Sequence, residues 1–263
     1  MTGASSELPH VTWCPTGPLA FLPLHAAGVY SKDSPRNAMD LAASSYTPTL
    51  EALLRTHSYT PNSIQYPKIL AVLQADVAGY TPIPGSRTEV RSFQNFFPRG
   101  ADILEGSQGT INAVLGSMAK YDWVHLACHG KQDSGDPTNS AFVLHDGRLT
   151  LSTLMSQFLP RADLAVLSAC QTATGDETLP EEAVHLTAGM LSVGYKSVVG
   201  TMWSIYDSSA PIVMNKFYEV MAEQTNVGKL QPAYALHKAI VALRGQYGDD
   251  DFVRWVPYVH FGL

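Results

Sequence analysis

The sequence is poor in charged side chains, which make up 15% of its 263 residues, whereas hydrophobic residues make up 45%. Such a composition can fill a sizeable core and argues against a disordered chain. With 17 Lys and Arg against 23 Asp and Glu, the formal net charge is −6. This mild acidity provides no basic face for a phosphate backbone, so we expect no direct contact with nucleic acid.

Cysteine is also scarce. Cys14, Cys128 and Cys170 form neither an even framework nor a CxxC pair, which argues against a disulfide scaffold and favours a reducing compartment. The N-terminal segment lacks the apolar stretch of a secretion signal. No apolar run reaches the roughly 18 residues that a membrane span requires. We therefore expect a cytoplasmic protein that does not enter a membrane.

The first 60 residues differ in pattern from the rest. Short apolar runs separated by turn residues predict a β-hairpin over 8–30. Residues 31–47 are polar and predict a loop, and Thr47-Pro48 is typical of an N-cap followed by proline in the first helical position. We therefore expect a small N-terminal hairpin–helix region of the same folding unit, with the boundary near residue 60.

Residues 61–263 alternate strand and helix patterns. Strands are expected at 68–75, 102–105, 123–128, 164–169 and 197–202. Helices are expected at 87–97, 110–121, 181–193, 207–223 and 230–245. Ser86 and Glu89 have the spacing of a capping box, and Asp146-Gly147 predicts a hairpin turn. This order predicts an α/β core whose mainly parallel sheet is covered by helices on both faces.

Two predicted strands end in reactive side chains. His129 follows the strand at 123–128, and Cys170 follows the strand at 164–169. Because ligands bind beyond the carboxyl ends of parallel strands, the two side chains share one crevice if their strands are neighbours. A thiol needs a base to become a strong nucleophile, and an imidazole serves near neutral pH. No Asp or Asn is clearly placed to orient His129, so these residues suggest a dyad.

Two other interpretations of these residues remain open. A cysteine or histidine at a strand end is often only a packed core residue. His125, Cys128 and His129 could also ligate a metal, although no second ligand pair lies at zinc spacing elsewhere. Adjacent Cys128 and His129 would moreover point to opposite faces of a strand. We expect no metal and no cofactor.

Three sequence blocks resemble a known family. They are His-Leu-Ala-Cys-His-Gly at 125–130, Leu-Ser-Ala-Cys-Gln-Thr-Ala at 167–173 and Val-Val-Gly-Thr-Met-Trp-Ser-Ile-Tyr-Asp at 198–207. They resemble, in this order, the signature blocks of CHAT domains, which are caspase-like peptidase domains related to separases and often found with TPR repeats. Nearly the whole chain is covered, through Trp255-Val-Pro-Tyr-Val-His-Phe-Gly262. The resemblance implies a three-layer αβα caspase-like fold and a cysteine endopeptidase.

The resemblance also implies residue roles. It selects His129 as the base and Cys170 as the nucleophile that forms an acyl-enzyme, and it leaves His125 a structural role. Gly130 has no Cβ, so its N–H can approach a substrate carbonyl; with the N–H of Cys170 it would form an oxyanion hole. Separases have an Asp after a Trp that receives a basic P1 side chain.

By this likeness Asp207 would form the floor of an S1 pocket and Trp203 a wall. A carboxylate in a partly dry cleft selects Arg or Lys through charge-assisted hydrogen bonds. The alternatives are that Asp207 caps the helix that follows it and that Trp203 belongs to the core.

The expected partner is a protein substrate. The chain contains no repeats of its own, so we expect the protease module of a larger protein with a regulatory TPR or sensor domain. The main alternative is a catalytically idle caspase-like interaction module. A thiol hydrolase or acyltransferase acting on a small ester finds no support in a Gly-x-Ser-x-Gly motif or a cofactor loop.

Overall fold

A mixed sheet with helices on both faces forms the centre of the computed structural model, which describes residues 8–31, 36–57, 67–133, 135–168 and 182–262. Within these residues the sheet has eight strands in the order β1-β4-β13-β12-β11-β7-β5-β6. All neighbouring strands are parallel except β12 and β13, which are antiparallel. The strands are β1 (His10–Trp13), β4 (Ala43–Tyr46), β5 (Ile69–Leu73), β6 (Ala101–Glu105), β7 (Trp123–Ala127), β11 (Leu164–Leu167), β12 (Ser197–Thr201) and β13 (Tyr258–Gly262).

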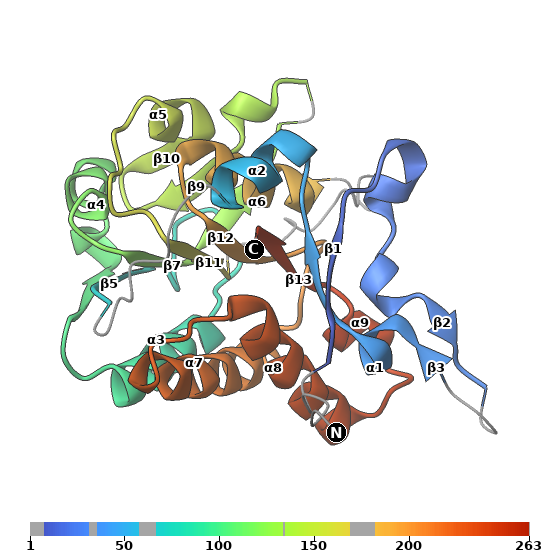
Figure 1. The fold of residues 1–263 in the computed structure, drawn as a ribbon. Helices are drawn as coiled ribbons and strands as arrows, with labels where there is room; N and C mark the ends of the chain where they lie inside the picture. The colour runs from blue at the N-terminus through green and yellow to red at the C-terminus, as the bar shows by residue number, and fades with distance from the viewer. Residues whose placement is uncertain (1–7, 32–35, 58–66, 134, 169–181, 263) are drawn as a thin grey trace.

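Helices cover both faces of this sheet. Figure 1 shows α3, α7 and α8 along one face and α2, α4, α5 and α6 on the other. The helices are α1 (Ala38–Leu41), α2 (Leu50–His57), α3 (Gly85–Phe96), α4 (Ile111–Met118), α5 (Leu151–Met155), α6 (Glu182–Val193), α7 (Ala210–Asn226), α8 (Pro232–Tyr247) and α9 (Phe252–Trp255). The three-layer αβα arrangement expected from the sequence is thus confirmed.

The central strands are apolar throughout because both faces are covered. In β5, Ile69, Ala71 and Leu73 belong to the core beneath α3 and α7, whereas Leu70 and Val72 belong to the core beneath α4 and α6. All five residues are buried. Alternate side chains of one strand therefore fill two separate cores, which fixes the strand's register.

Shorter elements complete the chain. A second sheet has the order β10-β9-β8, and β9 and β10 form the expected hairpin. Its two turn residues are His145 and Asp146, not Asp146 and Gly147, because Gly147 already pairs with Leu144. The remaining strands are β2 (Gly28–Val29), β3 (Arg36–Asn37), β8 (His129–Lys131), β9 (Ala141–Leu144) and β10 (Gly147–Thr150). Single-turn 3₁₀ helices are η1 (Gly17–Phe21), η2 (Leu24–Ala26), η3 (Gly106–Gln108) and η4 (Pro137–Asn139). None of the described helices is long and apolar enough to cross a bilayer.

The N-terminal region corrects one expectation. The hairpin expected over 8–30 is wrong: β1 pairs in parallel with β4, and two 3₁₀ helices follow β1 where a second strand was expected. A small antiparallel pair does occur, but it joins β2 and β3. Parallel partners need a long connection, so local turn signals could not reveal this pairing. The boundary near residue 60 lies outside the described residues and stays a prediction.

Two helix starts also differ from expectation. Helix α2 begins at Leu50, and the hydroxyl of Thr49, not Thr47, accepts the N–H of Ala52 at 3.0 Å. Helix α3 begins at Gly85, so the predicted capping box of Ser86 and Glu89 lies within the first turns. The Ser86 hydroxyl donates to the Ile83 carbonyl instead. Glu89 is buried and faces the sheet.

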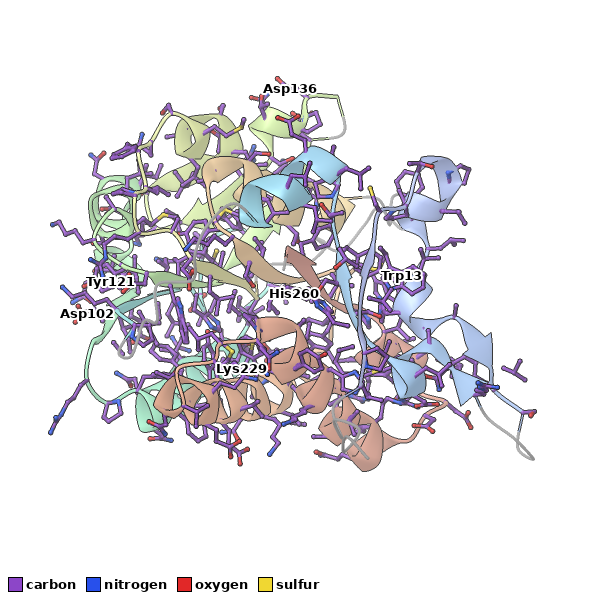
Figure 2. All side chains as sticks on the ribbon, in the orientation of Figure 1. Trp13, Asp102, Tyr121, Asp136, Lys229 and His260 are labelled. Atoms are coloured by element: carbon purple, nitrogen blue, oxygen red, sulfur yellow. The ribbon has the colours of Figure 1, made fainter. Side chains whose placement is uncertain are left out.

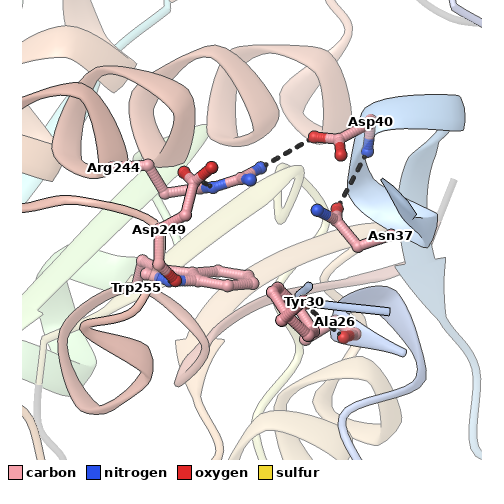
Figure 3. A network of polar contacts seen from close by, with 7 residues as sticks. All are labelled: Ala26, Tyr30, Asn37, Asp40, Arg244, Asp249 and Trp255. Carbon is pink, nitrogen blue, oxygen red and sulfur yellow. Dashed lines mark hydrogen bonds and ion pairs between the residues drawn. The ribbon is translucent and has the colours of Figure 1, made fainter. Parts of the chain in front are cut away.

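Charged and aromatic contacts fasten the N-terminal region to the C-terminal helices (Figure 3). Arg244 on α8 binds Asp40 on α1 at 3.1 Å and Asp249 at 2.9 Å. Its guanidinium also lies 4.9 Å from the centre of the Trp255 ring. Arg244 is only 8% exposed, so these partners compensate a largely desolvated charge.

Candidate active site

The sheet brings together the two strands that precede the predicted dyad. Strands β7 and β11 are direct parallel neighbours, with Leu126 opposite Leu167. Each of these residues lies three positions before one member of the dyad in the sequence. The shared crevice was expected only if these two strands are neighbours, and they are. Cys170 itself lies outside the described residues.

His129 begins β8, immediately after the β7 end. Its side chain is buried, with the residue 3% exposed, and its Nε2 lies 2.9 Å from the Thr81 carbonyl oxygen. A carbonyl only accepts hydrogen bonds, so Nε2 carries the hydrogen. In the neutral ring, Nδ1 then holds the lone pair that can accept a proton. The Thr81 backbone thus orients the predicted base, a role for which the sequence offered no side chain.

Tyr80 holds the same imidazole by stacking. The two ring centroids lie 4.9 Å apart with 27° between the ring planes. Burial lowers the pKa of His129 below its usual 6.5, and the hydrogen bond to Thr81 opposes this shift. Burial therefore prevails and favours the neutral, proton-accepting ring near pH 7. Beside the stack, Tyr80 and Val143 border a cavity of about 380 Å³.

Gly130 follows the base in β8 and pairs with Phe142 of β9. It is partly exposed, unlike His129. The strand β8 therefore carries the predicted base and the expected oxyanion donor side by side, next to the end of β7. The second expected donor, the N–H of Cys170, lies outside the described residues.

Asp207 lies between β12 and α7 and is partly buried. Its Oδ2 accepts a hydrogen bond from the Gly85 N–H at 2.8 Å. Asp207 thus caps the first turn of α3, although it lies 122 residues later in the sequence. The alternative that Asp207 caps the following helix is wrong, because the N-cap of α7 is Ser209. Trp203 is partly buried and packs against the cores on both faces of the sheet.

His125 lies in the core, as the structural role implied. It is fully buried; its Nδ1 lies 2.7 Å from the Tyr218 hydroxyl and its Nε2 3.4 Å from Oε2 of Glu89. Burial, with the Glu89 carboxylate adding to it, raises the Tyr218 pKa well above 10, so the phenol stays protonated and donates to Nδ1. Because Nδ1 accepts this hydrogen bond, Nε2 carries the ring hydrogen, which faces Glu89.

Metal ligands do not gather in the described part of the chain, where no group of three or more His, Cys, Asp or Glu side chains is close enough to hold an ion. Cys128 is buried in the core that lies beneath α4 and α6. His125 has other neighbours, namely Tyr218 and Glu89. The three side chains of the His-x-x-Cys-His run thus have separate surroundings, since His129 contacts Thr81 and Tyr80 instead.

Sequence reasoning missed Tyr80, Thr81 and Gly85. Tyr80 and Thr81 lie in the loop between β5 and α3, and Gly85 is the first residue of α3. In this loop Gly79 has a φ of 86°, and Pro82 and Pro84 flank Ile83. A glycine- and proline-rich loop after a buried parallel strand was a usable signal, because such loops line the crevice at the carboxyl ends of strands.

A family comparison covers the whole core and the N-terminal region. The family described as "CHAT domain" matches residues 2–263. No curated protein sequence matches the chain.

Solved structures of two caspase-like peptidases share the fold. The crystal structure of the Arg-specific cysteine proteinase gingipain R is 10% identical, with a TM-score of 0.57, over 83% of this chain and 53% of that one. A complex of its pro- and mature domains, from Porphyromonas gingivalis, gives a TM-score of 0.56. Separase from Saccharomyces cerevisiae, bound to securin, is 15% identical, with a TM-score of 0.56, over 86% of this chain and 14% of that one. The chain thus spans about half of gingipain R and a seventh of separase.

Proposed function

Because the chain belongs to the CHAT domain family, we propose that it is a cysteine endopeptidase with Cys170 as nucleophile and His129 as base. One observation carries this proposal: an oriented imidazole stands at the end of β7, beside the strand that leads to Cys170. The hydrogen bond from Nε2 to the Thr81 carbonyl leaves Nδ1 as the proton acceptor.

The reaction follows from these roles. Nδ1 of His129 takes the thiol proton of Cys170, and the sulfur attacks the scissile carbonyl carbon. The N–H groups of Gly130 and Cys170 stabilise the oxyanion of the tetrahedral intermediate. The imidazolium then protonates the leaving amine, which departs and leaves a thioester. A water molecule, deprotonated by the same imidazole, hydrolyses the thioester and restores the thiol.

Asp207 supports a preference for Arg or Lys at P1. Its Oδ2 binds the Gly85 N–H, while no hydrogen bond to Oδ1 occurs among the described residues. One oxygen would therefore cap α3 and the other would bind a basic side chain, with Trp203 as a pocket wall. Gingipain R, whose fold this chain shares, is named as an Arg-specific proteinase.

The wider setting follows from the family. A CHAT domain is often linked to TPR repeats, and this chain contains none. We propose that the chain is the protease module of a larger protein in which a TPR or sensor domain controls access of the protein substrate. Phosphate-rich partners are disfavoured by the net charge of −6.

A peptide-library cleavage profile tests the activity. We expect cleavage by the wild-type chain and a loss of at least 1,000-fold in the Cys170→Ala variant, because the nucleophile is absent. His129→Gln should lose activity to a similar degree. Continued cleavage by Cys170→Ala would overturn the mechanism. Absence of cleavage by the wild-type chain under all conditions would favour an idle interaction module.

Asp207→Asn tests the specificity in the same library. The amide keeps an oxygen that can accept the Gly85 N–H, so α3 remains capped while the negative charge is lost. We expect kcat/KM for Arg and Lys at P1 to fall about 100-fold relative to neutral P1 residues. An equal loss on every P1 residue would contradict the S1 assignment.

A further inference from the structure

A stiff six-residue segment, Tyr80–Gly85, joins the loop after β5 to the first residue of α3, and we call it the strap. The Ile83 N–H donates to the Ala75 carbonyl at 2.9 Å, and the Ile83 side chain is buried. Pro82 and Pro84 fix two further φ angles. The middle of the strap is thus anchored to the end of β5, and its two ends project with little freedom.

The first end of the strap holds the base by two different contacts. The Thr81 carbonyl accepts from Nε2 of His129 at 2.9 Å and so fixes the direction of the ring in its plane. Tyr80 stacks at 4.9 Å between centroids and limits rotation out of that plane. Together they leave the imidazole a single orientation, with Nδ1 pointing away from the strap.

The second end holds Asp207. The Gly85 N–H donates to Oδ2 at 2.8 Å, and a Cβ at this position would lie 2.4 Å from the Asp207 carbonyl oxygen and 2.7 Å from Oδ1. Only glycine permits this approach. The close contact fixes the carboxylate relative to the same backbone segment that orients the base.

We propose that the strap is a positioning element that sets the catalytic base and the specificity carboxylate relative to each other. Tyr80 is the positioning residue for His129, and Gly85 is the positioning residue for Asp207. This inference rests on the proposed function. If so, both proton transfer and P1 binding depend on one backbone segment. A change at Tyr80 then affects kcat, and a change at Gly85 affects KM for substrates with a basic P1 residue.

Tyr80 is tested by comparing Tyr80→Phe with Tyr80→Ala. Phenylalanine keeps the stacked ring, so kcat should stay within twofold of wild type. Alanine exposes the imidazole to water, which should reduce kcat about tenfold with little change in KM. It should also shift the acid limb of the pH profile toward pH 6.5, because solvation restores the ordinary pKa of His129.

A second readout does not require activity. Side-chain NMR titration of His129 in a Cys170→Ala background follows the imidazole directly and removes the thiol, its proposed partner, from the titration. Among the described residues, Tyr80 makes a ring contact with this imidazole and the Thr81 carbonyl makes a hydrogen bond with it. We expect the same pKa in Tyr80→Phe as in the parent and a higher one in Tyr80→Ala.

Gly85→Ala tests the other end. The added Cβ must displace Asp207, so KM for substrates with basic P1 residues should rise about tenfold or more, while cleavage after neutral residues changes little. Gly245→Ala on α8 is the matched control, because a Cβ there meets no atom within 4 Å.

The outcomes separate the two proposals. If Tyr80→Ala leaves both the His129 pKa and kcat unchanged, or if Gly85→Ala leaves P1 selectivity unchanged, the strap has no positioning role, even though Cys170-dependent cleavage stands. If cleavage does not depend on Cys170, the proposed function falls, whereas the NMR titration still decides whether Tyr80 sets the state of His129.

Discussion

At the scale of single residues, His125 and His129 lie only four positions apart in the sequence but have different surroundings. His129 lies beyond the end of β7 and contacts Thr81 and Tyr80, whereas His125 lies within the strand and contacts Glu89 and Tyr218 in the core. The difference follows from position along the strand, since only residues at the carboxyl end reach the ligand-binding edge.

His125→Ala should therefore act on stability. Its loss would leave the buried Glu89 carboxylate without the imidazole N–H that faces it and would open a cavity, which together cost about 3–5 kcal/mol. We expect urea unfolding to show this loss, while the remaining folded protein keeps its turnover. Adding the Glu89→Gln substitution to the His125→Ala variant should recover part of the lost stability, because the double variant buries no carboxylate at this position. Loss of turnover with an unchanged unfolding curve would exchange the roles of the two histidines.

At the scale of elements, glycines set how closely helices approach the sheet. Gly200 in β12 lies under α6, and a Cβ there would lie 2.5 Å from Oγ1 of Thr187. Thr187 is fully buried and cannot move into solvent. The small residue thus lets α6 pack directly on the strand that leads to Trp203 and Asp207.

Gly200→Ala should destabilise the protein by about 1–3 kcal/mol through overpacking between β12 and α6. Gly116→Ala on α4 is the matched control: a Cβ there meets nothing within 4 Å, so the change should stabilise by about 0.5–1 kcal/mol. Thermal unfolding of both variants measures the contrast. A stable Gly200→Ala variant would show that α6 can shift away from the sheet.

At the scale of the whole molecule, a chain of side-chain hydrogen bonds crosses four strands. His260 on β13 contacts Ser45 on β4 at 2.6 Å and Ser197 on β12 at 2.7 Å. Ser45 in turn contacts His10 on β1 at 2.6 Å. Figure 2 shows His260 inside the molecule, near the middle of the sheet. These hydrogen bonds link the N-terminal strands β1 and β4 to β12, which is the direct neighbour of β11.

The protein should therefore lose stability in mild acid. Burial lowers the pKa of His260 to about 3 and that of His25 to about 4, so each histidine stays neutral when folded but is protonated near pH 6.5 when unfolded. Because the unfolded state binds more protons, stability falls as pH drops from 6.5 toward these values. Each group contributes up to about 1.4 kcal/mol per pH unit.

Urea unfolding at several pH values between 4.5 and 7.5 measures this slope. The His260→Gln variant has no group that titrates at this position, so its slope should be smaller by about one protonation equivalent. An unchanged slope would show that His260 is not responsible for the loss in acid.

The sequence alone determined the layered α/β core, because continuous apolar runs suit parallel strands covered on both faces and helical patterns lie between them. It also placed His129 and Cys170 after strand patterns. Only the tertiary structure decided that β7 and β11 are neighbours, that β1 pairs in parallel with β4, and that one loop reaches both His129 and Asp207. These contacts join residues far apart in the chain, and no local pattern encodes which distant backbone carbonyl or N–H a side chain will meet.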